Sequence, residues 1–253
     1  MRKALILTTI AGAVALAGCK TMDSGNIGSM MDTGSTAMKA MTLSDGDVVT
    51  LSNESCEAMD AANKIAPANS KYTQRLNKVI ANMPKDVDGK KAVYKVYMTS
   101  DVNAWAMANG CIRVYSGLMD LMNDDELRGV IGHEIGHVAL GHSKKRMQTA
   151  YATSALRQAA ANSSGALGSL SRSEAGAVGE KFIHAQFSQS NESEADNYSF
   201  DLLTKQKMER KGLVTAFQKL AKLGGGGGNS LMSSHPPSEE RAKAMQARLD
   251  GKK

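Results

Sequence analysis

The chain has little of several residue types, and each shortage narrows the possible functions. It has only three cysteines, and none forms a CxxC pair or shows metal-ligand spacing, which excludes a cysteine-based metal or dithiol motif. The formal net charge of +6 comes without a dense basic block, so nucleic acid is not an expected partner. Aromatic residues make up only 4%, whereas methionine is frequent with 16 residues. We interpret these methionines as filler of the core and of helix surfaces rather than as a cofactor site.

The N-terminus has the features of a secretory signal. A basic start at residues 2–3 precedes a mostly apolar run at 4–15, which is too short for a transmembrane helix. The run ends in Leu-Ala-Gly-Cys at 16–19, which resembles the bacterial lipobox, whose cysteine is lipidated and becomes the new N-terminus. We therefore predict a lipoprotein signal peptide at 1–18 and a lipid on Cys19. The alternative is an ordinary signal that happens to have a cysteine nearby.

Export decides how the remaining features are interpreted. Lys20 stands where an aspartate would favour retention in the inner membrane, so we expect a lipid anchor in the outer membrane, facing the periplasm. In that oxidising compartment Cys56 and Cys111 predict a disulfide worth on the order of 4 kcal/mol in the chain-entropy model. Two buried thiols are the alternative. Loss of Arg2 and Lys3 with the signal lowers Lys+Arg from 31 to 29 against 25 Asp+Glu, so the mature net charge is +4.

Past the signal, the sequence predicts a tether followed by one folded domain. Residues 19–43 are rich in small and polar residues without periodicity and predict a flexible tether, and residues 44–253 predict the domain. Strand-forming residues at 93–98 and, after an Asn-Gly turn signal, at 111–115 predict a small antiparallel sheet. We expect an α+β, mostly helical fold. The predicted helices begin near 44 or 52 and lie at 72–83, 123–142, 145–187, 191–206, 213–223 and 238–249, with a flexible five-glycine loop at 224–228.

One helical stretch carries a catalytic motif. His133, Glu134 and His137 form an HExxH pattern. The two histidines are four residues apart and stand on one face of a helix, where they can share a zinc ion, and Glu134 can reach a water on that ion. Neighbouring residues are apolar, and ionisable groups in such surroundings are costly unless paired or bound to metal. Gly132 and Gly136 weaken the helix, which indicates that another segment approaches closely. The alternative is a surface helix with chance residues.

A hydrolytic zinc ion usually has three protein ligands and one open position, so a third ligand must come from elsewhere. His142 lies about half a turn out of phase with His133, which excludes it as a ligand. Glu192 and Asp196 share one face of a later helix, whereas Glu194 points largely away. One of the two carboxylates could bind zinc while the other holds the second ring nitrogen of a ligand histidine. An acidic, solvated helix is the alternative.

Together these motifs resemble one peptidase family. The HExxH motif at 133–137, followed by Glu-x-Glu-Ala-Asp at 192–196, is similar to the HtpX-type metallopeptidases of peptidase family M48, and the resemblance covers about residues 55–250. Further similar segments are 102–106, 110–114, 116–118, a His-Pro motif at 234–237, and Arg241. Unlike HtpX itself, the chain has no series of transmembrane segments.

The resemblance implies a fold, a reaction and roles for particular residues. The fold would be a zincin-like (gluzincin) domain with its small sheet next to the HExxH helix. The reaction would be endoproteolysis with one Zn²⁺ per chain, acting on misfolded or unassembled envelope proteins. The implied site residues are the ligands His133, His137 and Glu192, the base Glu134, the supporting carboxylate Asp196, His235 near the metal, and Asn103 and Ala104 along the substrate cleft.

Other functions stay open at this point. The chain could be a lipoprotein chaperone or assembly factor whose zinc site is mostly gated shut, with His235 in the open metal position. It could also be a zinc hydrolase of another bond, such as a cell-wall amide. Glu134 argues against a purely structural zinc, which is normally four-coordinate and needs no base. For His235 three roles are open: a plug on the metal, a donor to the tetrahedral oxyanion, or a structural role beside the last helix.

Overall fold

The computed structural model describes residues 43–160, 170–223, 230–235 and 239–251. The predicted signal peptide, Cys19, nearly all of the predicted tether and the five-glycine run lie outside the described residues. None of the described helices combines the length and the apolar character that a membrane crossing requires. The described chain begins with the buried Leu43, and Ser44 then caps the first described helix.

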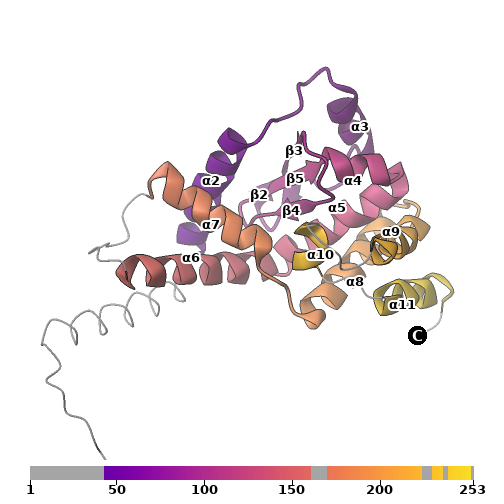
Figure 1. Ribbon diagram of the computed structural model, residues 1–253. Helices are drawn as coiled ribbons and strands as arrows, with labels where there is room; N and C mark the ends of the chain where they lie inside the picture. Colours follow the sequence, from indigo (N-terminus) through magenta and orange to yellow (C-terminus); the bar gives the residue numbers. More distant parts are fainter. Residues whose placement is uncertain (1–42, 161–169, 224–229, 236–238, 252–253) are drawn as a thin grey trace, which may run out of the picture.

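The described chain is mostly helical with a small amount of sheet, as predicted (Figure 1). The elements in chain order are α2 (Asp45–Ala62), α3 (Lys71–Val79), β1 (Asp86–Val87), β2 (Lys90–Lys91), β3 (Val93–Tyr97), β4 (Ala104–Ala106), β5 (Cys111–Tyr115), α4 (Ser116–Leu121), α5 (Asp124–Ala139), α6 (His142–Ala160), α7 (Arg172–His184), α8 (Gln189–Lys205), α9 (Lys211–Lys222), α10 (Ser230–Ser234) and α11 (Glu239–Leu249).

The main sheet is mixed rather than purely antiparallel. Its strand order is β3-β5-β4, with β3 parallel to β5 and β4 antiparallel to β5. The predicted antiparallel pairing of 93–98 with 111–115 is therefore wrong. The Asn109-Gly110 turn is present, and Gly110 adopts a φ of 82°, but the turn joins β5 to the three-residue β4. A strand this short shows no alternation that would reveal it in the sequence.

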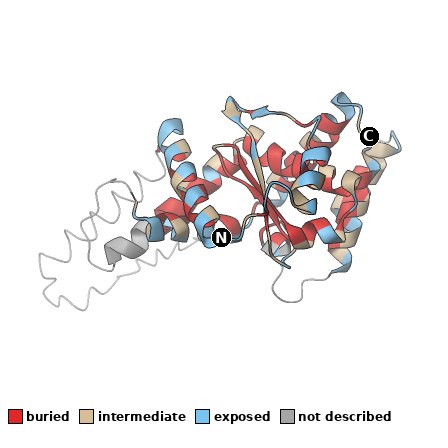
Figure 2. Ribbon diagram, turned by 90° about the horizontal axis from the view of Figure 1, so that it is seen from above, coloured by how far each residue is buried: buried red, intermediate tan, exposed pale blue. Residues whose placement is uncertain are grey.

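The HExxH helix α5 is buried along nearly its whole length. Figure 2 shows that buried residues run through the middle of the described molecule, with exposed residues on its outside. Helix α8 packs directly against α5, because two glycines leave room. A Cβ added to Gly132 would lie 2.5 Å from Oγ of Ser199, and one added to Gly136 would lie 3.1 Å from Cα of Ala195. The close approach predicted from these glycines is confirmed, and it brings the acidic face of α8 onto the two histidines of α5.

Both ends of α5 have local causes. The side chain of Asn123 accepts a hydrogen bond from the backbone N–H of Glu126, whose carboxylate accepts one from the backbone N–H of Asn123, which is the predicted capping box. The helix ends at Ala139 rather than near residue 142. Gly141 adopts a φ of 75°, which turns the chain before α6 begins.

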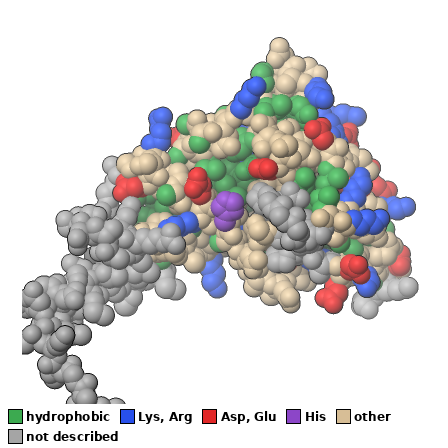
Figure 3. All heavy atoms as spheres, viewed as in Figure 1, with side chains coloured by type: hydrophobic (Ala, Val, Ile, Leu, Met, Phe, Trp, Pro, Cys, Tyr) green, Lys and Arg blue, Asp and Glu red, His purple; other side chains and the backbone are tan. Residues whose placement is uncertain are grey.

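Charge is spread rather than concentrated on the face shown in Figure 3. Among the described residues of that face, Lys and Arg side chains alternate with Asp and Glu, and apolar side chains lie between them. This face therefore carries no large field of one sign.

An ion cluster around the buried Arg113 joins α2 to the sheet next to the predicted disulfide. Cys56 of α2 and Cys111 of β5 form that disulfide, which confirms the pairing. The Arg113 side chain is only 2% exposed, and its Nε and Nη2 donate to the two Asp60 carboxylate oxygens at 2.8 and 2.9 Å. Lys95 donates to the same carboxylate at 2.7 Å. Burial raises the pKa of Asp60, but hydrogen bonds from Arg113 and Lys95 outweigh it and leave the pKa below its ordinary value.

We expect Asp60→Asn to lower the free energy of unfolding by about 3 kcal/mol, because Arg113 would stay buried without its counter-charge. Since the folded-state pKa of Asp60 is depressed, its stabilising effect is present above the unfolded pKa of about 3.9 and is lost as pH falls through the folded value. The difference in the free energy of unfolding between wild type and variant should therefore become smaller below about pH 4. Urea unfolding across pH, with the exposed Asp101→Asn as control, measures this, and a pH-independent difference would contradict it.

Candidate metal centre

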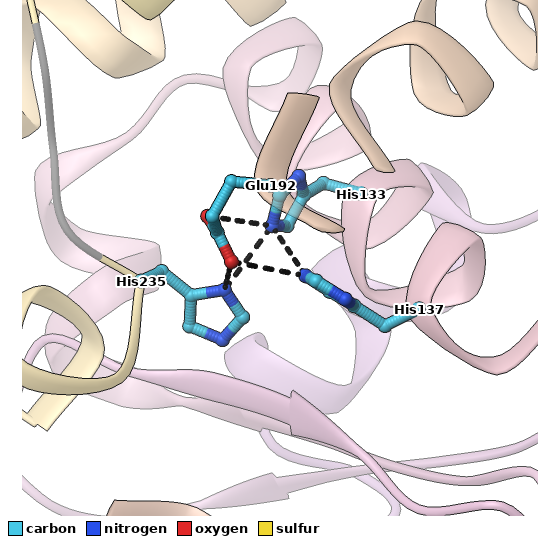
Figure 4. Close-up of side chains that lie close together, drawn as sticks. All are labelled: His133, His137, Glu192 and His235. Atoms are coloured by element: carbon cyan, nitrogen blue, oxygen red, sulfur yellow. Dashed lines mark hydrogen bonds and ion pairs between the residues drawn. The ribbon is translucent and has the colours of Figure 1, made fainter. Parts of the chain in front are cut away.

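Two histidines of α5 present ring nitrogens to the same point. His133 and His137 stand one turn apart, and both are buried. Their Nε2 atoms lie 3.0 Å from each other (Figure 4). Oδ1 of Asp196 lies 2.8 Å from Nδ1 of His133, so the proton of that ring is held on Nδ1 and Nε2 keeps a lone pair. Asp196 thus lies where the sequence predicted a carboxylate that holds a ligand histidine.

Two further side chains complete the cluster from other parts of the chain. Glu192, in the first turn of α8, places Oε2 at 3.5 Å from Nε2 of His133 and Oε1 at 3.3 Å from Nε2 of His137. His235, directly after α10, places Nδ1 at 3.0 Å from Oε1 of Glu192 and 3.2 Å from Nε2 of His133. All four donor atoms lie within 4.8 Å of one another.

The donor set fits a small divalent cation. Ligand atoms on a tetrahedral ion at about 2.1 Å are separated by about 3.4 Å, close to the spacings found here. Two imidazole lone pairs that face each other at 3.0 Å would repel without a cation or a proton between them. Burial lowers the pKa of His137 well below its ordinary value, so this imidazole is neutral and can act as a ligand. His133, His137, Glu192 and His235 could therefore hold a metal ion together.

Glu134 lies beside the cluster without being part of it. Its carboxylate is buried, Oε1 has no hydrogen-bond partner, and the same oxygen lies 3.5 Å from Nε2 of His235. Burial raises the pKa of Glu134, which makes its carboxylate a stronger proton acceptor than an exposed one. Such a group can take a proton from a water molecule that attacks a substrate.

Arg241 of α11 neutralises the buried acids. It donates to both carboxylate oxygens of Asp196, from Nε at 2.8 Å and from Nη2 at 2.6 Å, and its Nη1 lies 2.6 Å from Oε2 of Glu192. Burial raises the pKa of Asp196, but the hydrogen bonds from Arg241 and His133 lower it by more, so the acid stays ionised. The C-terminal helix is therefore part of the centre.

Two side chains at the site were missed by the sequence analysis. Phe187 stacks face to face on the His137 ring, with centroids 3.7 Å apart. The guanidinium of Arg146, on α6, lies 4.1 Å from the centre of the Phe187 ring and donates to the backbone oxygens of Ile183 and Ala185. Phe187 stands alone in the short connector between α7 and α8, so no periodicity marks it.

The predicted substrate residues lie at the edge strand β4. The N–H of Tyr115 donates to the carbonyl of Asn103, and the N–H of Met107 donates to the carbonyl of Cys111. Because inward and outward groups alternate in an antiparallel pair, the backbone N–H and C=O of Ala104 point away from β5. The Asn103 side chain is fully buried near the Tyr115 hydroxyl, and neither of its amide atoms has a partner with good hydrogen-bond geometry.

Comparison with known proteins identifies the family. The sequence pattern of the family described as "Peptidase family M48" matches residues 67–249, which include every residue of the candidate centre. The chain belongs to peptidase family M48. It is 49% identical to metalloprotease LoiP of Escherichia coli (strain K12) over 98% of both chains, and 48% identical to metalloprotease YcaL of the same organism over 97% of this chain and 96% of YcaL. It is also 30% identical to mitochondrial metalloendopeptidase OMA1 of Arabidopsis thaliana over 57% of this chain and 29% of OMA1.

Membership establishes the reaction class. The M48 chain is a metalloendopeptidase, and the fold around its HExxH helix is the zincin-like one predicted from the sequence. Residues 1–66, which include the predicted lipidation site and Cys56, lie outside the family match.

We expect Ala in place of His133, His137 or Glu192 to remove the bound metal, because each side chain supplies a donor atom. Asp196→Ala should weaken binding by roughly 10–100-fold rather than abolish it. Glu194→Ala is the comparison variant and should lose far less metal than Glu192→Ala, because this residue lies on the same helix but contacts His142 instead of the cluster. Metal per chain is measured by mass spectrometry of the purified protein. Equal metal loss in the Glu194 and Glu192 variants would contradict the assignment.

Proposed function

We propose that this M48 metallopeptidase is a zinc endopeptidase, anchored by a lipid on Cys19, that degrades misfolded or unassembled proteins of the bacterial envelope. The observation that supports zinc is the cluster of three imidazoles and one carboxylate, which lies beside a buried Glu134 whose Oε1 has no hydrogen-bond partner. Such a set with a separate base is typical of hydrolytic zinc sites. The lipobox-like Leu-Ala-Gly-Cys at 16–19 and the similarity to two Escherichia coli metalloproteases support the proposed location.

The residues of the centre divide the chemistry among themselves. Zinc, when bound by His133, His137 and Glu192, supplies the Lewis acidity that polarises a peptide carbonyl and acidifies a water. Glu134 accepts the proton of the attacking water and delivers it to the leaving amine. Burial of Glu134 keeps bulk water away from this proton transfer. Asp196 holds the ring of His133 so that Nε2 stays directed at the metal.

The substrate adds as an extended strand beside β4. The outward backbone groups of Ala104 offer a donor and an acceptor at an edge that no described strand occupies. Main-chain pairing of this kind holds a peptide straight with little demand on its sequence, which suits a protease of unfolded chains. The buried amide of Asn103 has no partner with good hydrogen-bond geometry and lies beside the Tyr115 hydroxyl, which supports a role in binding, since buried polar groups are normally satisfied. Ala104 is 1% exposed, so the segments that cover it must move before a substrate enters.

Glu134→Gln should lower cleavage of an unfolded reporter protein by roughly 10²-fold or more, because a base is lost while the metal ligands remain. Zinc content should equal that of wild type. Glu180→Gln on the exposed face of α7 is the control and should cleave normally. Cleavage is followed by mass spectrometry in wild type and in a His235→Ala background. Near wild-type turnover by Glu134→Gln in both backgrounds would overturn the proposed mechanism.

His235 acts as a plug that keeps the site closed. Its Nδ1 lies next to the atoms of Glu192 and His133 that would bind the metal. The imidazole would therefore occupy the fourth position on the metal, which a water must occupy for hydrolysis. The backbone N–H of Phe187 donates to the carbonyl of Ser234 at 3.1 Å, so the connector before α8 holds the residue next to the plug. The same closed arrangement favours the second candidate function, a chaperone or assembly factor with little proteolysis.

At saturating zinc, His235→Ala should raise the rate of reporter cleavage, because the fourth position becomes open, and should weaken zinc binding, because a donor is lost. An oxyanion donor would instead produce a loss of roughly 10²-fold or more. If His235→Ala changed neither the rate of cleavage nor the zinc affinity, only a structural role would remain for His235. The exposed His184→Ala serves as control, and initial rates are measured together with zinc affinity by chelator competition.

A further inference from the structure

His142 lies against the side of His137 that faces away from the candidate metal centre. The positive φ of Gly141 ends one helix, and α6 begins with His142 directly behind His137. Nδ1 of His142 lies 3.1 Å from Nδ1 of His137, and Nε2 of His142 lies 3.0 Å from Oε2 of Glu194. His142 is 8% exposed, whereas the Glu194 side chain is 53% exposed.

The direction of the hydrogen bonds follows from the chemistry of imidazole. When Nε2 of His137 gives its lone pair to a metal, the ring proton is on Nδ1 and must be donated. The only acceptor at hydrogen-bond distance among the described residues is Nδ1 of His142. A neutral His142 that accepts at Nδ1 carries its own proton on Nε2, which then donates to Glu194. Every donor in this series meets an acceptor.

We propose that His142 and Glu194 are positioning residues that fix the tautomer and the ring orientation of His137 for zinc. The proposal rests on the zinc site proposed above. Each ligand histidine then has its own support, Asp196 for His133 and the His142–Glu194 pair for His137. The stacked ring of Phe187 limits how His137 can tilt, and the hydrogen bond to His142 decides which nitrogen faces the metal.

Asp196, which supports His133, and the His142–Glu194 pair, which supports His137, differ in exposure, so their removal should weaken zinc binding to different extents. Asp196 is buried and paired with Arg241, so no solvent can replace it. Glu194 is half exposed, so water can accept the proton of His142 when the carboxylate is removed. His142 itself is buried, and its loss leaves the N–H of His137 without an acceptor.

Zinc affinity, measured by competition with a chromogenic chelator, tests the pair. His142→Phe keeps a ring of similar size but removes the acceptor, and should weaken zinc binding roughly 10- to 100-fold. His142→Asn places an amide oxygen near the former Nδ1 and should restore most of the affinity. Glu194→Gln should cost less than His142→Phe. His184→Phe and Glu180→Gln, both on the exposed side of α7, are the matched controls and should bind zinc as wild type does.

The tautomers themselves can be observed. Nitrogen–proton correlation spectra of the zinc-loaded protein should show His142 protonated on Nε2 and not on Nδ1. Zinc binding through Nε2 by itself places the proton of His137 on Nδ1, so the His142 signal is the one that distinguishes the positioning role from a purely structural one. Wild-type zinc affinity in a folded His142→Phe, no recovery in a folded His142→Asn, or a proton on Nδ1 of His142 would each overturn the proposal. Thermal unfolding of the metal-free variants shows whether they fold.

These measurements do not depend on proteolysis. Weaker zinc binding in His142→Phe would support the positioning role even if wild type cleaved no protein, and then only the proposed peptidase function would fail. If wild type cleaves protein while His142→Phe binds zinc as wild type does, only the positioning role fails.

Discussion

The close contact between α8 and α5 is the constraint on which the metal centre depends. Two glycines in the HExxH helix allow the backbone of α8 to approach so closely that Glu192 reaches both histidines. Larger residues at Gly132 or Gly136 would hold the helices apart, and a shift of about 1 Å is enough to spoil ligand geometry. Glycine lowers the stability of the helix, but its small size is required at both positions for the two helices to come this close.

The second constraint is electrostatic. Glu134, Glu192 and Asp196 are three acids in one buried volume, and ionised acids are costly there without compensation. Arg241 supplies part of the compensating charge from the last described helix, and a bound cation would supply more. Charge balance therefore links the C-terminal helix to the motif in α5, more than a hundred residues earlier in the chain.

Local patterns in the sequence were sufficient for much of the fold and of the site. The HExxH motif, the Asn123 capping box and the spacing of Glu192 and Asp196 all depend on residues within one helix, where position along the sequence determines position in space. The sheet was harder, because the parallel pairing of β3 with β5 depends on a crossing that no local pattern encodes. Phe187 and Arg146 were missed for the same reason. Their importance arises only when α6, α7 and α8 meet around His137.

The disulfide between Cys56 and Cys111 has a mechanical consequence. Helix α2 precedes the residues that match the M48 family. In the sequence, the segment between the proposed lipid on Cys19 and the domain leads into the N-terminal end of α2. A pull on that segment would act on α2 first. The covalent bond, with the Asp60–Arg113 pair beside it, carries such a load into β5 of the central sheet. Tension of the kind that the proposed anchor would exert would therefore be resisted before α2, the first described helix, separated from the catalytic body.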